Sequence, residues 1–287
     1  MQEQIYKIPK IDTFCSQHIF ECGQCFRWNK ELDGSYTGVF KNNVLNVKEE
    51  NNQIIFCGIC EGNIEKVVTE YFDLNRDYEN MQKELSNVDD NVKQSISYGK
   101  GIRLLNQDLW ETIISFIISA NNNIPRINGI IERISKQYGN EIEWNNKTYY
   151  TFPTAKELSK ATVEDLRKLG LGFRDKRVYD TTHIILSKQV NLEDLQKEDT
   201  NKVRDILLTL PGVGPKVADC ILLFSTLKRL EVFPIDVWVR RVMNDLYIHN
   251  PQEEKVNKKE IERLAIQKYG KLAGIAQQYL FYWKREA

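Results

Sequence analysis

The chain has 287 residues, of which 41% are hydrophobic and 28% charged, which is the composition of a globular protein with a sizeable core. No window holds 18 uncharged apolar residues, so the sequence predicts no membrane-spanning helix. The N-terminus has neither the basic nor the apolar region of a secretory signal, and we therefore expect a protein that is not secreted.

The charges balance overall but are unevenly distributed. Forty lysines and arginines face forty aspartates and glutamates, so the net charge gives no sign of a nucleic-acid partner. Residues 41–100 hold seven basic and eleven acidic side chains, whereas residues 201–287 hold fifteen basic and ten acidic ones. This asymmetry permits a polyanion site on the C-terminal part of the chain.

Six cysteines are too few for a disulfide scaffold in a chain of this length, and we expect free thiols. Cys22 and Cys25 form one CxxC pair, and Cys57 and Cys60 form a second pair after a gap of 31 residues. The gap is longer than in a usual zinc ribbon, so free thiols are the favoured interpretation and a zinc site is the alternative.

Four segments between residues 25 and 58 alternate apolar and polar side chains and are separated by turn-forming residues, which predicts an antiparallel meander. From Asn63 onward the hydrophobic period is that of helices, and we expect no further strand. The sequence therefore predicts an α+β fold. Its expected parts are an N-terminal antiparallel β-sheet domain over residues 1–104, a helical lobe over residues 105–205 and a second helical lobe over residues 206–287.

Capping patterns locate several helix ends. A cap residue with an acid three positions later predicts helices that begin near Leu109, Ala155 and Lys258. Apolar periodic segments are followed by three glycines that we expect to end helices: Gly139, Gly170 and Gly270.

The most informative motif lies within residues 200–242. A helical segment leads into LPGVGP (residues 210–215), and a second helix begins at once. Gly212 and Gly214 permit a tight hairpin, and Pro215 suits the first position of a helix. The backbone amides of such a hairpin and helix N-terminus form a phosphate-binding surface.

Lys216 is expected in the first turn of that second helix. There the helix dipole and any burial favour the uncharged amine, which is the form that attacks carbon. Twenty residues later Asp236 is predicted as the N-cap of another helix, with Pro234 fixing its approach. Taken singly, these residues would be interpreted as a surface lysine and a simple cap, but the joint pattern is more specific.

This pattern resembles the helix-hairpin-helix motif and Gly/Pro-rich loop of the DNA glycosylase superfamily, whose bifunctional members carry the lysine. Five segments, in the family's order and spread over nearly the whole chain, narrow the resemblance to the 8-oxoguanine DNA glycosylase family: GQCFRW (23–28), SFIISANNNIPRI (115–127), LGLGFRDKRV (169–178), LPGVGPKVADC (210–220) and AGIAQQYLF (273–281).

The resemblance implies an enzyme that turns a damaged nucleotide out of the duplex. Lys216 would attack C1′, displace the base and hold the sugar as a Schiff base, from which β-elimination nicks the strand, while Asp236 would stabilise the developing positive charge. The expected partner is double-stranded DNA with 8-oxoguanine opposite cytosine, bound by a monomer in the cytoplasm, at the nucleoid or in the nucleus. No cofactor is expected, and no iron–sulfur cluster, because no four-cysteine cluster follows Asp236.

The family's base pocket corresponds to four residues here. The carbonyl of Gly23 would accept the N7 proton that distinguishes 8-oxoguanine from guanine. Gln277 would read the base edge, and Phe281, four residues later, would stack on one face of the base. Cys220 would stack on the opposite face of the base. Without the resemblance these would be interpreted as a turn glycine, a core stripe and a buried filler.

The family's contacts with the opposite strand also have counterparts. Asn121 would fill the vacated space in the stack, and Arg126 and Arg174 would read the orphaned cytosine. Phe173 stands where the family has tyrosine and would wedge into the stack.

Four further residues concern the DNA backbone. Trp238 stands where the family has a phosphate-binding histidine, and an indole keeps one donor but carries no charge. The carbonyls of Leu208, Leu210 and Val213 are expected to be able to hold a structural cation in the hairpin.

Two alternative functions remain at this stage. One is a non-catalytic helix-hairpin-helix DNA-binding module, which Lys216 disfavours. The other is a glycosylase for alkylated bases, which Gly23 and Gln277 disfavour because they suit a neutral purine edge.

Overall fold

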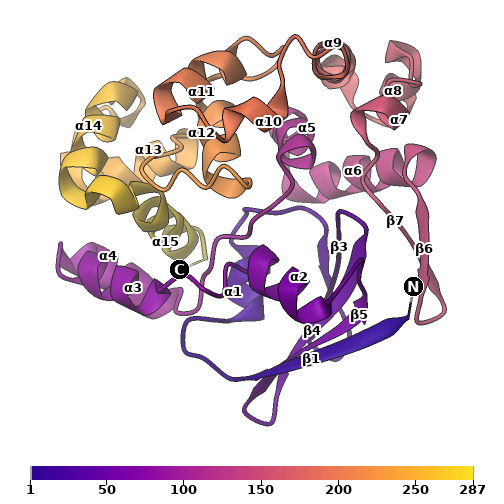
Figure 1. Cartoon of the computed structure of the whole chain (residues 1–287). Coiled ribbons are helices and arrows are strands. Elements are labelled where there is room, and N and C mark those ends of the chain that lie inside the picture. The colour runs from indigo at the N-terminus through magenta and orange to yellow at the C-terminus, as the bar shows by residue number, and fades with distance from the viewer. Residues whose placement is uncertain (1, 287) are drawn as a thin grey trace.

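The computed structural model describes residues 2–286 as a five-stranded sheet domain beside a larger group of helices (Figure 1). All neighbouring strands of the sheet are antiparallel, in the order β1-β5-β4-β3-β2. Their bounds are β1 Glu3–Pro9, β2 Trp28–Lys30, β3 Tyr36–Phe40, β4 Asn43–Glu50 and β5 Gln53–Ile59.

The predicted meander is confirmed as β2 to β5, and an edge strand precedes it. β1 pairs with β5 over its full length, with Ile5 opposite Cys57. The seven residues of β1 are exposed or half-buried throughout, and Ile5 is 61% exposed. Without a buried face the segment lacks the apolar signal of a strand, and its backbone pairing with β5 defines it.

Helices make up most of the rest of the chain. The first group comprises α1 Ser16–Glu21, α2 Ile64–Tyr71, α3 Tyr78–Ser86, α4 Asp90–Tyr98, α5 Leu109–Ser119 and α6 Ile124–Tyr138. The second comprises α7 Ala155–Leu158, α8 Val163–Lys168, α9 Asp175–Leu186, α10 Leu192–Leu195, α11 Thr200–Leu208, α12 Pro215–Phe224, α13 Val237–Met243, α14 Lys258–Tyr269 and α15 Ala273–Glu286.

The predicted helix starts are confirmed, since α5, α7 and α14 begin at Leu109, Ala155 and Lys258. In each case the side chain of the preceding residue accepts a hydrogen bond from a first-turn amide. The predicted helix stops are also found: Gly139 and Gly270 cap α6 and α14, and Gly170 follows the last turn of α8.

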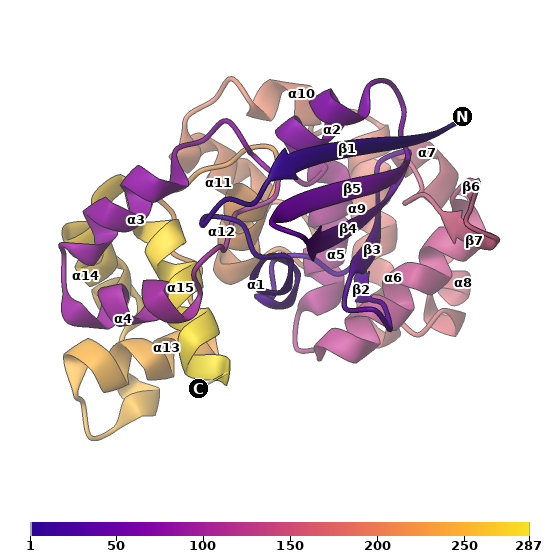
Figure 2. The same ribbon diagram turned by 90° about the horizontal axis from the view of Figure 1, so that it is seen from below.

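The expectation that no strand follows residue 63 is wrong. A hairpin of β6 (Glu141–Trp144) and β7 (Lys147–Tyr150) follows α6. Asn145 and Asn146 at its tip have φ of 51° and 57°, the left-handed conformation that asparagine tolerates and that a tight hairpin turn requires. Ile142 of this hairpin packs with Val39, Val44 and Ile59 on the sheet. Figure 2 shows the hairpin next to α6.

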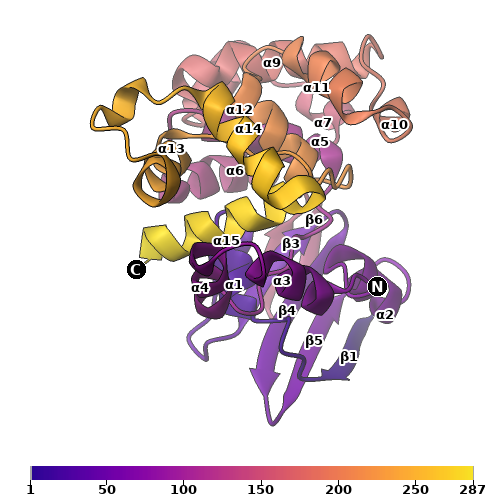
Figure 3. The same ribbon diagram turned by 90° about the vertical axis from the view of Figure 1, so that its left-hand side faces the viewer.

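The sheet and the helices have separate cores. An aromatic core, including Phe20, Trp28 and Phe56, lies between the sheet and helices α1 and α2. The larger core joins α5, α12 and α15, and α3 and α4 pack against α15 in it (Figure 3). Gln82 of α3 donates to the hydroxyl of Tyr279 on α15 at 2.8 Å. The division of the chain at residues 104 and 205 stays a prediction.

The two CxxC pairs do not converge. Cys22 and Cys25 precede β2, whereas Cys57 lies on β5, and β3 and β4 separate those two strands. Nowhere in residues 2–286 do three or more histidine, cysteine, aspartate or glutamate side chains gather as a metal site requires, so the zinc alternative is not supported. In the same residues no helix has both the length and the apolar character that crossing a membrane demands.

An ionisable pair ties the sheet domain to α5. Arg27 is 7% exposed, donates to the carbonyl of Tyr150, and lies with Nη1 3.9 Å from Oε1 of Glu111. Burial raises the pKa of Glu111 from 4.5 to about 7, against the opposing effect of Arg27. The folded protein therefore holds this proton more tightly than the unfolded chain does. This tighter proton binding by Glu111 contributes fully to the stability of the folded state below pH 4.5. The contribution is lost as the pH rises through about 7.

We predict that Glu111→Gln flattens the pH dependence of stability. The amide cannot ionise, so the free energy of unfolding should fall less for the variant than for the wild type between about pH 5 and about pH 8. Denaturant titrations at both pH values measure this difference, with Glu132→Gln, an exposed acid on α6, as the control. Parallel pH profiles for Glu111→Gln and the wild type would contradict the prediction.

Candidate active site

The predicted hairpin joins α11 to α12. Gly212 has φ of +89°, and a Cβ there would lie 3.0 Å from Cδ of Arg177 and 3.1 Å from Cγ2 of Ile117, so conformation and space both require glycine. Gly214 is exposed and is the N-cap of α12, with no side chain capping the helix. The first amides of α12 are therefore available to an anion.

Lys216 stands in the first turn of α12, as predicted. It is half-buried, and its Nζ lies 5.5 Å from the centre of the Phe116 ring. One turn later Cys220 is 3% exposed. Burial raises the pKa of the Cys220 thiol to about 11, while the charge of Lys216 lowers it and the charges of Asp219 and Asp236 raise it.

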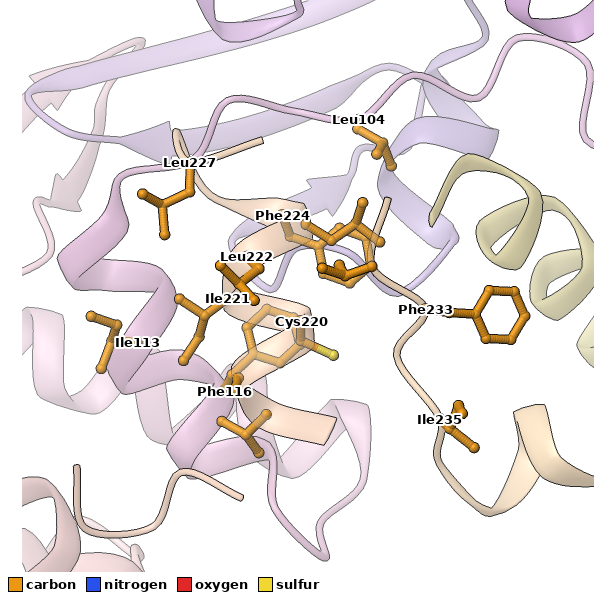
Figure 4. Packing of buried hydrophobic residues seen from close by; sticks show 14 of the residues in the cluster. Leu104, Ile113, Phe116, Cys220, Ile221, Leu222, Phe224, Leu227, Phe233 and Ile235 are labelled. Atoms are coloured by element: carbon orange, nitrogen blue, oxygen red, sulfur yellow. The ribbon is translucent and has the colours of Figure 1, made fainter. Parts of the chain in front are cut away.

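Asp236 follows the segment that faces α12 at this site. It is the N-cap of α13, and its Oδ1 accepts a hydrogen bond from the amide of Val239 at 2.8 Å. The Cys220 sulfur points from α12 toward the segment that carries Phe233 and Ile235, immediately before Asp236 (Figure 4). Lys216 stands one turn before Cys220 on α12, and Asp236 follows the segment that the Cys220 sulfur faces, so the predicted amine and carboxylate lie on the two elements that meet at this thiol.

Gly23 lies in a turn that packs on the C-terminal helix. Its φ is +86°, and a Cβ there would lie 3.1 Å from Nη1 of Arg285 and 3.6 Å from Cε1 of Phe281. On the same helix Gln278 donates to the carbonyl of Cys22 at 2.5 Å. The structure thus brings Phe281 next to Gly23 across most of the length of the chain.

Gln277 precedes Gln278 on α15 and is 5% exposed. Its buried Oε1 has no hydrogen-bond partner within residues 2–286. An unsatisfied buried acceptor costs free energy, so native proteins keep one where a ligand completes it. The amide oxygen is therefore suited to a bound molecule with a donor, such as a base edge.

Four predicted DNA contacts gather at the end of α5. Asn121 is exposed with φ of 52°, and Arg126 is exposed and donates to the carbonyl of Gly170 at 3.3 Å. The ring of Phe173 is 56% exposed, with the guanidinium carbons of Arg174 and Arg177 at 4.2 and 5.1 Å from its centre.

Arg174 differs from its predicted role. It is 1% exposed, and it donates from Nε and Nη2 to the carbonyl of Ala120, at 2.8 and 2.6 Å, and from Nη2 to that of Asn121 at 2.6 Å. The donors expected to read a base are engaged with backbone, because the carbonyls of Ala120 and Asn121 at the end of α5 need partners. In this conformation Arg174 positions Asn121.

The guanidinium groups here form a positive cluster. Burial lowers the pKa of Arg174, and the neighbouring charges of Arg126 and Arg177 lower it further. Like charges held together favour binding of a polyanion. Arg177 was not singled out from the sequence, although it lies within LGLGFRDKRV and contacts the position of Gly212.

Trp238 is 48% exposed on α13. The guanidinium carbon of Arg241 lies 5.8 Å from its ring centre, so a positive charge stands near the place where the family has histidine. Helical spacing of three residues is the sequence signal for this pair.

The proposed cation ligands lie on the hairpin. The carbonyl of Leu210 accepts a hydrogen bond from the amide of Val213 at 3.0 Å, and Leu208 ends α11. The cation stays a prediction.

Comparison with known proteins bears on this geometry. A family model described as 8-oxoguanine DNA glycosylase, N-terminal domain, matches residues 6–113, and one described as HhH-GPD superfamily base excision DNA repair protein matches residues 114–266. The chain belongs to the 8-oxoguanine DNA glycosylase family. This confirms the family predicted from the five segments.

Individual members of the family are similar over most of their length. The N-glycosylase/DNA lyase of Saccharomyces cerevisiae is 30% identical, and the alignment covers 96% of this chain and 86% of the relative. N-glycosylase/DNA lyase OGG1 of Arabidopsis thaliana is 29% identical, with 91% and 75% covered. The 8-oxoguanine glycosylase/lyase of Clostridium acetobutylicum, solved with double-stranded DNA containing cytosine opposite 8-oxoG, is 40% identical with a TM-score of 0.93, and 99% and 97% of the two chains are covered.

Membership of the 8-oxoguanine DNA glycosylase family fixes the class of the protein. It is a base-excision DNA repair enzyme of the DNA glycosylase and lyase type, and DNA is its partner. The alternative of a non-catalytic DNA-binding module is therefore not supported.

We predict that Arg174→Ala loosens the loop that carries Asn121. Two carbonyls would lose buried partners, which costs about 1–3 kcal/mol, and the amides of residues 119–123 should exchange hydrogen faster. Unfolding titrations and hydrogen exchange measure both effects. Arg177→Ala is the matched control, because it removes the other guanidinium that lies over the Phe173 ring. It should lower the free energy of unfolding by less than about 0.5 kcal/mol. Wild-type exchange in Arg174→Ala would argue against the positioning role.

Proposed function

We propose that this enzyme excises 8-oxoguanine from duplex DNA and nicks the resulting abasic strand, with Lys216 as nucleophile and Asp236 as the group that stabilises positive charge. The observation that carries the assignment is that α12, with Lys216 in its first turn, and the segment that ends at Asp236 meet at the buried thiol of Cys220. An amine and a carboxylate at one site, each at a helix N-terminus, are what covalent displacement at an acetal carbon requires.

The reaction proceeds in two stages. The lone pair of the Lys216 amine forms a bond to C1′ while the bond from C1′ to the base breaks, and its electrons leave with the base, which takes up a proton. The attached nitrogen loses a proton, its lone pair forms a double bond to C1′ as the C1′–O4′ bond breaks, and O4′ takes up a proton, which opens the sugar and gives the Schiff base. Loss of a proton from C2′ expels the 3′ phosphate, and water then hydrolyses the Schiff base and frees Lys216.

Asp236 acts on the first stage. Positive charge develops on the sugar as the base leaves, and a carboxylate near C1′ stabilises that charge. Its hydrogen bond from the Val239 amide holds the carboxylate in place. A fixed carboxylate needs no reorganisation during the reaction.

Recognition of the lesion rests on Gly23, Gln277 and Phe281. 8-Oxoguanine carries a proton on N7, so the Gly23 carbonyl accepts from it, whereas guanine presents an acceptor there and is repelled. Phe281 lies against Gly23 and supplies the stacking surface. The unpartnered Oε1 of Gln277 accepts from the base edge, and Cys220 packs on the second face.

The strand opposite the lesion meets Asn121, Arg126 and the exposed ring of Phe173. Cytosine has acceptors on its pairing edge, which suits the donors of Arg126 and the amide of Asn121. The hairpin amides at Gly212 and Gly214 and the indole of Trp238 bind phosphates. The protein acts as a monomer on 8-oxoguanine opposite cytosine. The structure of the Clostridium acetobutylicum relative with that DNA supports the proposed pairing.

The nucleophile is tested by trapping. Borohydride reduction of the wild type on lesion-containing duplex should give a covalent protein–DNA adduct, and Lys216→Gln should give no adduct, no base release and no nick while still binding the duplex. Lys202→Gln, an exposed lysine of α11, is the control and should trap normally. An adduct with Lys216→Gln would overturn the assignment, and no adduct with the wild type would refute the lyase step.

Opposite-base selectivity is tested on duplexes that carry the lesion opposite each of the four bases. The wild type should prefer cytosine, and Arg126→Ala should lose about 1–3 kcal/mol of that preference. Arg133→Ala is the matched control, because Arg133 lies on the same helix and also donates to a carbonyl of the segment after α8, that of Leu169. Unchanged ratios in Arg126→Ala would remove this residue from the interface.

A further inference from the structure

The turn that carries Gly23 and the helix that carries Lys216 share one side chain, that of Gln107. Its Nε2 donates to the carbonyl of Gln24 at 2.7 Å and to the carbonyl of Phe224 at 3.0 Å. Gln24 follows Gly23 directly, and Phe224 is the last residue of α12. A single amide group therefore links the two elements that the proposed reaction must bring to one nucleotide.

Gln107 is itself fixed to the end of α12. It forms an isolated parallel bridge with Ser225, and the amide of Thr226 donates to its carbonyl at 2.8 Å. The backbone of Gln107 thus moves with α12. Because residues 217–224 are buried and helical, a displacement at Phe224 is transmitted along the helix to Lys216 in its first turn.

The other end of the link is equally constrained. Gln24 is 0% exposed, and its Nε2 donates to the carbonyls of Ile19 and Arg103 at 2.9 and 2.8 Å. Its Oε1 accepts from the amide of Leu105 at 2.8 Å. Gln24 therefore holds the turn against the segment that leads into Gln107.

These bonds leave the Gly23 carbonyl available. The carbonyls on both sides of it accept from glutamine amides, Cys22 from Gln278 and Gln24 from Gln107. Within residues 2–286 no hydrogen bond ends on the carbonyl of Gly23 itself. Pinning both neighbours fixes the direction of the central carbonyl while keeping it free for a ligand.

We propose that Gln107 is a positioning residue that sets the distance between the Gly23 carbonyl and the Lys216 amine. The inference rests on the proposed function, in which one nucleotide must present N7 to Gly23 and C1′ to Lys216 simultaneously. Excision of the base therefore needs the Gly23 carbonyl and the Lys216 amine at the correct distance from each other. Nicking of a preformed abasic site needs only the Lys216 end, because no base is present to be read.

The test therefore compares two activities of the same protein. Gln107→Met keeps the length of the side chain but removes both donors, and Gln107→Glu replaces the amide with a carboxylate that faces two carbonyls. Each variant should lower kcat/KM for excision of 8-oxoguanine by about tenfold or more, with Gln107→Glu the lower of the two, because small misplacements of reacting groups have effects of this size. The rate of nicking on abasic duplex should stay within about twofold of wild type.

The neighbouring residue provides a matched control. Asn106 precedes Gln107 in the same segment, and its amide also donates to a backbone carbonyl, that of Glu70, at 2.6 Å. Glu70 lies on α2, which carries neither the Gly23 turn nor Lys216. Asn106→Asp removes the same kind of bond and should leave the ratio of the two activities unchanged.

The outcomes are distinguishable. Equal losses of excision and nicking in Gln107→Met, or no loss of either, would overturn the positioning role. A lowered ratio in Asn106→Asp as large as that in Gln107→Met would also overturn it, because any break in the segment would then suffice. Failure of the wild type to excise 8-oxoguanine would instead contradict the proposed function, and thermal unfolding of each variant shows whether it remains folded.

Discussion

The site depends first on the docking of α15 against the turn of residues 21–24. Phe281 lies against Gly23, Gln278 holds the carbonyl of Cys22, and Arg285 donates to the carbonyl of Glu21. These contacts join the two ends of the chain, and α15 lies between the sheet domain and helices α12, α13 and α14 (Figure 3). The proposed base pocket therefore requires the complete fold, because its residues come from both ends of the chain.

A second constraint is electrostatic. The chain has no net charge, yet Arg174 and Arg177 lie against the ring of Phe173, and Arg126 reaches Gly170 and Gly172 just before it. Affinity for a polyanion depends on the local arrangement of charges, and summing over the chain hides it. The buried guanidinium of Arg174 also satisfies backbone carbonyls, so the same charge supports the loop structurally and contributes to the potential that DNA meets.

Buried amides organise the centre of the molecule. Gln24, Gln107 and Gln278 each bond backbone carbonyls of segments far apart in the chain, which fixes those segments relative to one another. Gln277 is the exception, because its buried Oε1 has no hydrogen-bond partner among the described residues 2–286. Satisfied amides around one unsatisfied amide are the pattern of a rigid frame built to receive a polar ligand.

The sequence by itself determined the local features and the family. The hairpin at Gly212 and Gly214, the helix starts at caps and the four-stranded meander follow from short-range chemistry, and the five segments specified the family. The strand β1 was missed, because its backbone pairing with β5 defines it and it has no buried face. The hairpin β6–β7 was wrongly excluded by the expectation that no strand follows residue 63. Only the tertiary structure decided that Arg174 faces backbone and that Gln107 joins the Gly23 turn to α12. Those contacts connect residues that are tens to hundreds of positions apart, and no local pattern encodes which distant carbonyl a buried donor meets.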